Sequence, residues 1–128
     1  MKEIKLRGFH KKRKQMHDIV MVDSENGLVA LKMYDEDREE IYSEEELLKE
    51  VVLMLWTGLK DKKGVSVYEG DILSNGYVFQ DVYWNNNTAS FSCNSKGEKG
   101  WAMYVMVSSL EVVGNVFEDK ELIGGQAE

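Results

Sequence analysis

The segment that decides the fold lies near the middle of the chain, where residues 57–72 read TGLKDKKGVSVYEGDI. Its glycines Gly58, Gly64 and Gly70 stand among polar residues that are typical of turns. Glycine adopts positive φ at no steric cost, so each of them marks a point where the chain can reverse. The apolar anchors between these turns are Leu59, Val67, Tyr68 and Ile72. The segment therefore predicts short strands joined by tight turns, as in small barrels and sandwiches.

Short apolar runs and polar turns also alternate on both sides of this segment. Downstream, the predicted strands cover 65–67, 72–73, 77–84, 90–93, 101–107 and 110–116. Upstream, a strand with Ile4 and Leu6 ends near Gly8, the cations of 11–14 form a turn, and strands follow over 16–22 and 28–33. We therefore expect an N-terminal hairpin that extends into a meander. The tryptophans lie in strand-like sequence, and we expect a core role for Trp56, Trp84 and Trp101.

The region between the meander and the central segment is ambiguous. An acidic connection over 35–40 is followed by Ser43 and Glu46, whose spacing matches a capping box and predicts a helix start. The apolar run 51–56 that follows suits either a helix or a strand buried on both faces. Periodicity alone leaves the end of the helix open.

Size and charge limit the classes of function. The chain has 128 residues and a net charge of −7, which fits one domain whose average surface repels nucleic acid and acidic lipid. Its lone cysteine, Cys93, is typical of a reducing compartment. It shows no signal sequence, and 51–56 is far too short to span a bilayer. We expect a cytoplasmic protein without a membrane partner.

The residues that suggest metal binding do not form a site. The spacing of a calcium loop is matched by Asp35, Asp37, Glu39 and Glu46. Glu40, however, occupies the position where that loop needs glycine. His10 and His17 are the only histidines, and their spacing matches no zinc pair, so we expect ordinary residues that flank the first turn. The sequence predicts no metal and no other cofactor.

Candidate catalytic groups are equally sparse. Glu69 and Asp71 are a pair of carboxylates beside Tyr68, as a glycosidase would need, but they flank Gly70 in a tight turn. Carboxylates in such places usually cap backbone amides. Cys93 has no cation near it in sequence, so a reactive thiolate is not indicated. We therefore expect no enzyme activity.

The strongest binding alternative uses two basic turns. These cations are Lys11, Lys12, Arg13 and Lys14 in the first turn and Lys60, Lys62 and Lys63 in the central segment. Beside exposed aromatic residues of a small barrel they would contact single-stranded nucleic acid. The net charge argues against this use, and two separately solvated turns explain the cations as well.

Three stretches together resemble the YopX family, which phages and prophages encode. The central match is the segment 57–72, the first hairpin matches at 4–9 with Met16, and the closing motif matches at 110–119 with Glu121 and Leu122. The chain departs from the usual pattern at Gly8-Phe9-His10 and at Val65-Ser66. The resemblance implies a mostly β architecture, an SH3-like C-terminal half and no characterised activity. It also implies a strand before Thr57, which limits the helix to about 43–50.

We therefore predict a single YopX-like domain over 1–128, mainly β with one short helix. It comprises an N-terminal lobe (1–50) with the hairpin and meander, an SH3-like small barrel (51–119) and a tail (120–128), of which we expect residues 124–128 to be frayed. The scaffold of the family motif is formed by Gly58, Gly64, Tyr68, Gly70 and Asp71. The predicted function is non-enzymatic binding of an unknown protein partner or of further copies of the chain, through barrel loops and strand edges. We do not expect a nucleic-acid partner.

Overall fold

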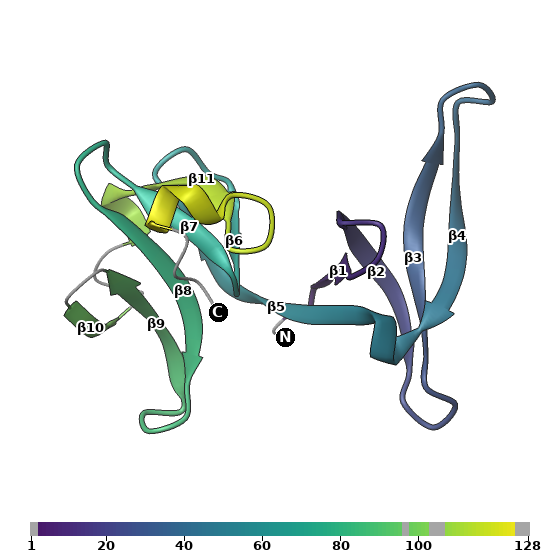
Figure 1. Ribbon diagram of the computed structural model, residues 1–128, viewed down its shortest axis with the longest axis horizontal. Helices are drawn as coiled ribbons and strands as arrows, with labels where there is room; N and C mark the ends of the chain where they lie inside the picture. Colours follow the sequence, from purple (N-terminus) through teal and green to yellow (C-terminus); the bar gives the residue numbers. More distant parts are fainter. Residues whose placement is uncertain (1–2, 96–97, 103–106, 125–128) are drawn as a thin grey trace. The chain divides into compact units, whose positions relative to one another are not determined.

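The computed structural model describes residues 3–95, 98–102 and 107–124, and its chain divides into two compact units. The units are Met1–Leu55 and Trp56–Glu128, so the division falls inside a strand rather than at the predicted residue 50. The described residues form two antiparallel sheets with short 3-10 helices only, which confirms the mainly β prediction (Figure 1). No helix in this part of the chain is long and apolar enough to cross a membrane.

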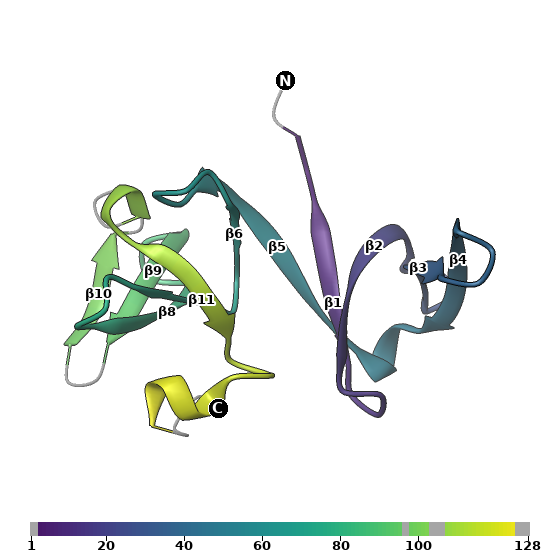
Figure 2. The ribbon, with the colours of Figure 1, turned by 90° about the horizontal axis from the view of Figure 1, so that it is seen from above.

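The N-terminal unit is an antiparallel meander that the first half of β5 extends on one side. Its sheet has the order β4-β3-β2-β1-β5, with bounds β1 Leu6–His10, β2 Gln15–Asp23, β3 Leu28–Asp35, β4 Glu40–Leu47 and β5 Val51–Lys60. β1 lies between β2 and β5, with Gly8 opposite both His17 and Leu53 (Figure 2). The predicted hairpin and meander are thus confirmed.

The core of this unit explains a glycine at position 8. Val29 and Leu31 are fully buried with Val51, and Ile19 packs against them. A Cβ on Gly8 would lie 2.5 Å from Val51 Cγ1 and 2.9 Å from Ile19 Cδ1. Carbon atoms do not approach so closely without strain, so the core has filled the space that a side chain would need.

The predicted helix over 43–50 is wrong for most of its length. β4 pairs with β3 along its whole length, from Asp35↔Glu40 to Leu28↔Leu47, and only the 3-10 helix η1, Leu48–Glu50, is helical. Ser43 does not cap a helix but lies opposite Lys32 in the ladder. The acidic connection is the turn of the β3–β4 hairpin, where Glu39 has φ 54°. Pairing with the preceding strand, β3, therefore prevails over the local capping signal.

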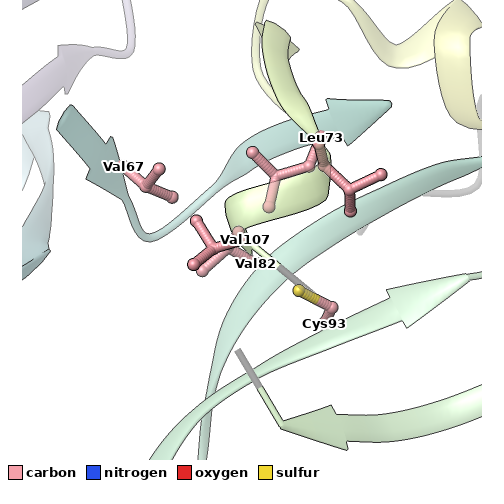
Figure 3. Close-up of a cluster of buried hydrophobic side chains, with 6 residues drawn as sticks. Val67, Leu73, Val82, Cys93 and Val107 are labelled. Carbon is pink, nitrogen blue, oxygen red and sulfur yellow. The ribbon is translucent and has the colours of Figure 1, made fainter. Parts of the chain in front are cut away.

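The C-terminal unit contains the second sheet. The far half of β5 first pairs with β6, Ser66–Tyr68. A five-stranded sheet then has the order β10-β9-β8-β7-β11, with bounds β7 Asp71–Ser74, β8 Phe79–Asn85, β9 Ser90–Ser95, β10 Glu98–Ala102 and β11 Glu111–Asn115. The 3-10 helix η2, Val107–Ser109, precedes β11. Buried side chains from these elements form one cluster: Val67, Leu73, Val82, Cys93, Val107 and Leu110 (Figure 3).

Several sequence predictions for this unit need correction. Trp84 is not a core residue but is 44% exposed, with its ring edge-on to Phe91 at 5.1 Å between centroids. Trp56 is half-buried, and the side chain of Trp101 lies outside the described residues. Within the predicted tail, Lys120–Ile123 form the 3-10 helix η3. Positions 103–106 of the predicted strand 101–107 and the end of the tail, 125–128, lie outside the described residues.

Candidate interaction surface

The family motif forms loops that hold the C-terminal unit together. Gly58, Gly64 and Gly70 have φ of 87°, 84° and 83°, which confirms the expected positive φ at each position. Gly64 and Gly70 lie in turns, whereas Gly58 lies within β5, where the register with β6 shifts between Trp56 and Lys60. Val67 and Ile72 are fully buried, and Leu59 packs against the core cluster. The predicted anchors thus do lie between the turns.

Asp61 fixes the loop that contains Gly64, a role that sequence reasoning did not find. Its buried Oδ1 accepts hydrogen bonds from the amides of Lys63 and Val65, both at 2.8 Å. Its Oδ2 accepts one at 2.8 Å from the amide of Val112 in β11. Burial alone would raise the pKa of this carboxyl, but its backbone donors outweigh burial and lower the pKa. The carboxylate therefore ties the loop to the last strand.

One carboxylate of the pair that a hydrolase would need, Asp71, is used in the same way. Asp71 is only 2% exposed, and its Oδ2 accepts a hydrogen bond of 2.8 Å from the amide of Tyr68. Asp71 thus closes the turn around Gly70, as the scaffold prediction requires. This contact supports a structural role for the carboxylate.

His10 is buried, contrary to the expectation of an ordinary residue beside the first turn. Its Nδ1 accepts a hydrogen bond of 3.1 Å from the amide of Arg13, so Nε2 carries the proton and donates to Glu46 Oε2 at 3.0 Å. The hydrogen bond from His10, followed by one from the Leu47 amide, lowers the pKa of Glu46. Both ring nitrogens are therefore engaged. His17 is half-buried, and the described residues contain no group of three metal-ligating side chains.

The cations of the first turn lie against acidic residues of β4 and η1. Arg13 Nη1 is 2.6 Å from Glu44 Oε2, and this hydrogen bond is the main reason why the pKa of Arg13 is raised. Lys12 Nζ is 3.7 Å from a carboxylate oxygen of Glu50, and Lys11 Nζ donates to the carbonyl of Lys49 at 2.8 Å. Part of this positive charge is thus neutralised within the unit. Lys14 has φ 57° at the end of the turn.

The second group of cations belongs to the other unit. Lys60 ends β5, whereas Lys62 and Lys63 are exposed in the following turn. Lys63 Nζ is 3.6 Å from Glu111 Oε2. The two basic turns therefore belong to different units of the chain, and each contains a cation beside a carboxylate.

Cys93 is an inert thiol, as its sequence surroundings indicate. The side chain is fully buried in the core cluster (Figure 3). Burial, and to a smaller extent the charge of Asp81, raises its pKa to about 12. A thiol with such a pKa holds almost no thiolate at neutral pH, so it supplies no nucleophile.

The outer edge of β4 combines a terminal position in the sheet with exposed apolar side chains. β4 is the last strand of its sheet, beyond β3 (Figure 1). Ile41 and the residue opposite it, Tyr34, are 66% and 58% exposed, and Tyr42 and Leu47 are 48% and 44% exposed. Isolated exposed apolar residues are common, but a row of them on a free strand edge indicates a contact surface.

The β3–β4 hairpin also carries the negative charge of the chain. Between Asp35 and Glu46 there are eight acidic residues and one cation, Arg38, which gives −7. That value equals the net charge of the whole chain, so the remaining residues are neutral in sum. The acidity that the composition reports is thus concentrated on one hairpin.

These observations define a class of protein: a small, mainly β protein whose most distinctive loops are held by buried carboxylates and glycine turns. The family model described as YopX protein matches residues 5–124. The chain therefore belongs to the YopX family. The crystal structure of protein EF1440 from Enterococcus faecalis is similar, with a TM-score of 0.67, 21% identity, and coverage of 96% of this chain and 99% of that chain. At that identity the likeness shows the fold alone. No curated protein matches the sequence.

Proposed function

We propose that this protein is a non-enzymatic accessory protein of a phage or prophage that acts in the cytoplasm by binding another protein. The observation that carries the proposal is the outer edge of β4, with Ile41, Tyr42 and Leu47 exposed along it. Exposed edges of this kind bind extended segments of other proteins by adding a strand. The buried carboxylates of the family motif support a scaffold rather than a catalytic role, because their oxygens accept backbone hydrogen bonds.

Unit Trp56–Glu128 is, in this proposal, an SH3-like small barrel. Its five-stranded antiparallel sheet with the order β10-β9-β8-β7-β11 and the 3-10 helix before β11 support that assignment. The unit would present its loops on a rigid framework, as small barrels do.

Self-association is the second form that binding would take. A small β protein hides an edge by pairing it with another copy. Light scattering at several protein concentrations measures this directly: a defined oligomer supports self-association, and a mass of 14.7 kDa throughout rejects it.

Affinity capture tests the proposal that the partner is a different protein. The immobilised protein is incubated with lysate of the host that carries the phage or prophage, beside an unrelated acidic protein of similar charge. We expect one protein that is captured only by the first, and that binds the purified chain saturably with Kd below about 10 μM. A strictly monomeric protein that captures no partner, or only proteins that the acidic control also captures, would contradict the proposal.

A further inference from the structure

We infer that the outer edge of β4 binds an extended, basic segment of the partner protein, which adds an antiparallel or parallel strand to the sheet of the N-terminal unit. The inference rests on the proposed function, because it names the chemistry of the partner for the same strand. It follows from the hydrogen-bond register, from the side chains beside the edge and from the distribution of charge.

The register shows which backbone groups of β4 point outward. The amide of Leu48 donates to the carbonyl of Gly27 at 2.8 Å, one step beyond the pair Leu28↔Leu47. In an antiparallel ladder, hydrogen-bonded pairs alternate with non-bonded pairs. The non-bonded positions of β4 are therefore odd-numbered, and they direct both N–H and C=O away from β3. At position 47 the amide already donates to Glu46 Oε1 at 3.2 Å.

Three consecutive outward positions therefore remain along the strand: Ile41, Ser43 and Glu45. All three residues are exposed, and no strand in the described part of the chain pairs with this side of β4. Together they offer three amides and three carbonyls in the spacing of a β ladder. This is the arrangement that strand addition requires.

Side chains beside the edge favour a segment that carries both apolar and polar side chains on one face. The side chains of Ile41, Ser43 and Glu45 lie on one face of the sheet because residues at a spacing of two share a face. Ile41 lies next to Tyr34 on that face, and both are more than half exposed. A strand added here would place an apolar side chain beside this pair and a polar one beside Glu45.

The negative charge of β4 favours basic residues at the polar positions of the partner segment. Glu44 and Glu46 are held by Arg13 and His10 from the inner side of the unit. Glu40 and Glu45 have no ion pair among the described residues. Glu45 is also one of the three positions whose backbone groups point outward. A second β4 would bring four more glutamates to the edge, and like charges on adjacent strands are destabilising. Lysine or arginine on the incoming segment would instead pair with these carboxylates.

A synthetic peptide tests the inference on the whole chain. The probe is a capped nine-residue peptide whose alternate residues, which share one face of a strand, are valine in one half and lysine in the other, with threonine between them. The control peptide has glutamate at each lysine position. A third peptide keeps the basic sequence but is N-methylated at every residue, which removes the donors along both edges. At low ionic strength we expect the basic peptide to bind at least about tenfold more tightly than either control.

Hydrogen exchange distinguishes strand addition from unspecific attraction between charges. In the free protein the amides of Ile41, Ser43 and Glu45 should exchange fast, whereas those of Tyr42 and Glu44 are protected by β3. On saturation with the basic peptide, the first three should become protected about tenfold or more while the other two change little. Equal binding of the acidic peptide, or binding without this alternating protection, would overturn the inference.

Two variants of the protein complete the test. Glu45→Lys should weaken binding of the basic peptide about tenfold, whereas the matched charge change Glu25→Lys, in the exposed β2–β3 turn, should leave it unchanged. Ser43→Pro should abolish binding, because proline has no N–H and thus removes the central outward donor. The N–H of Ser43 is not used in the ladder with β3, so the unit should stay folded, as circular dichroism would show. Equal effects of the two lysine variants would contradict the inference.

The same variants separate this inference from the proposed function. If a partner captured from host lysate still binds the folded Ser43→Pro protein, protein binding stands and the assignment to β4 fails. If light scattering shows a dimer that Ser43→Pro dissociates, the occupant is a second copy, and the basic partner is rejected. If no partner is captured but the peptide binds as described, the edge chemistry stands and the proposed function loses its support.

Discussion

At the scale of single residues, the close approach at Gly8 limits what the N-terminal core tolerates. Gly8→Ala would place a methyl group 2.5 Å from Val51 Cγ1. We expect it to lower the free energy of unfolding by about 1–3 kcal/mol, as overpacking does. Urea unfolding measures the change. In the double variant with Val51→Ala the two effects should be less than additive, because removal of the Val51 methyl groups makes room; full additivity would contradict the packing argument.

Asp61 controls the stability of the family motif in a pH-dependent way. Asp61→Asn replaces one acceptor oxygen with an NH₂ group that faces backbone donors, which should cost about 1–3 kcal/mol at pH 7. The pKa of Asp61 is lowered in the folded protein, so its stabilisation is complete above the unfolded pKa of about 3.9 and is lost as pH falls through the lower folded value. The difference between the two proteins should therefore narrow below about pH 4.

Urea unfolding at a series of pH values measures this difference for Asp61. Asp37→Asn, in the exposed β3–β4 turn, is the matched control and should change stability by less than about 0.5 kcal/mol. A difference between wild type and Asp61→Asn that stays constant down to pH 2 would show that the charge of Asp61 is not what the loop requires.

At the scale of elements, β4 depends on a contact that is distant in sequence. The imidazole of buried His10 joins the turn after β1 to Glu46 of β4, which lies 36 residues further along the chain. His10→Ala leaves the amide of Arg13 and the carboxylate of Glu46 without this partner and should cost about 1–3 kcal/mol in chemical unfolding. Glu45→Ala, on the outward side of the same strand, should change stability by less than about 0.5 kcal/mol. Equal effects of the two variants would rule out a role for His10 in holding β4.

The same element shows how far local sequence reasoning reaches. The positive φ of Gly58, Gly64 and Gly70 could be predicted because it is a local demand of the backbone. Ser43 and Glu46 were misleading because a capping spacing is local, whereas the contact that holds Glu46 depends on His10, 36 residues away. Asp61 was missed for a related reason, since its Val112 donor is 51 residues away. The edge of β4 became visible only once the strand order was known.

At the scale of the whole molecule, the sign of the charge differs between parts of the chain. Residues 35–46 of the β3–β4 hairpin hold a charge of −7, and the basic turns lie elsewhere, with Lys12, Arg13 and Lys63 each within 4 Å of a carboxylate oxygen. A cation that already has an acidic neighbour releases less counterion from a phosphate backbone. The basic turns should therefore contribute little to binding of nucleic acid.

Fluorescence anisotropy with a labelled single-stranded oligonucleotide checks this expectation. At about 150 mM salt we expect no binding at micromolar protein, and at low salt only weak binding with a shallow dependence on salt concentration. Replacement of Lys11, Lys12, Arg13 and Lys14 with serine should then change little. The competing result is tight binding of the oligonucleotide by the wild-type protein, with a steep salt dependence that becomes shallow in the serine variant. That result would assign a nucleic-acid function to the first turn. The basic peptide and the oligonucleotide thus probe opposite signs of charge on one protein, and binding of the peptide alone would locate its recognition surface on the acidic hairpin.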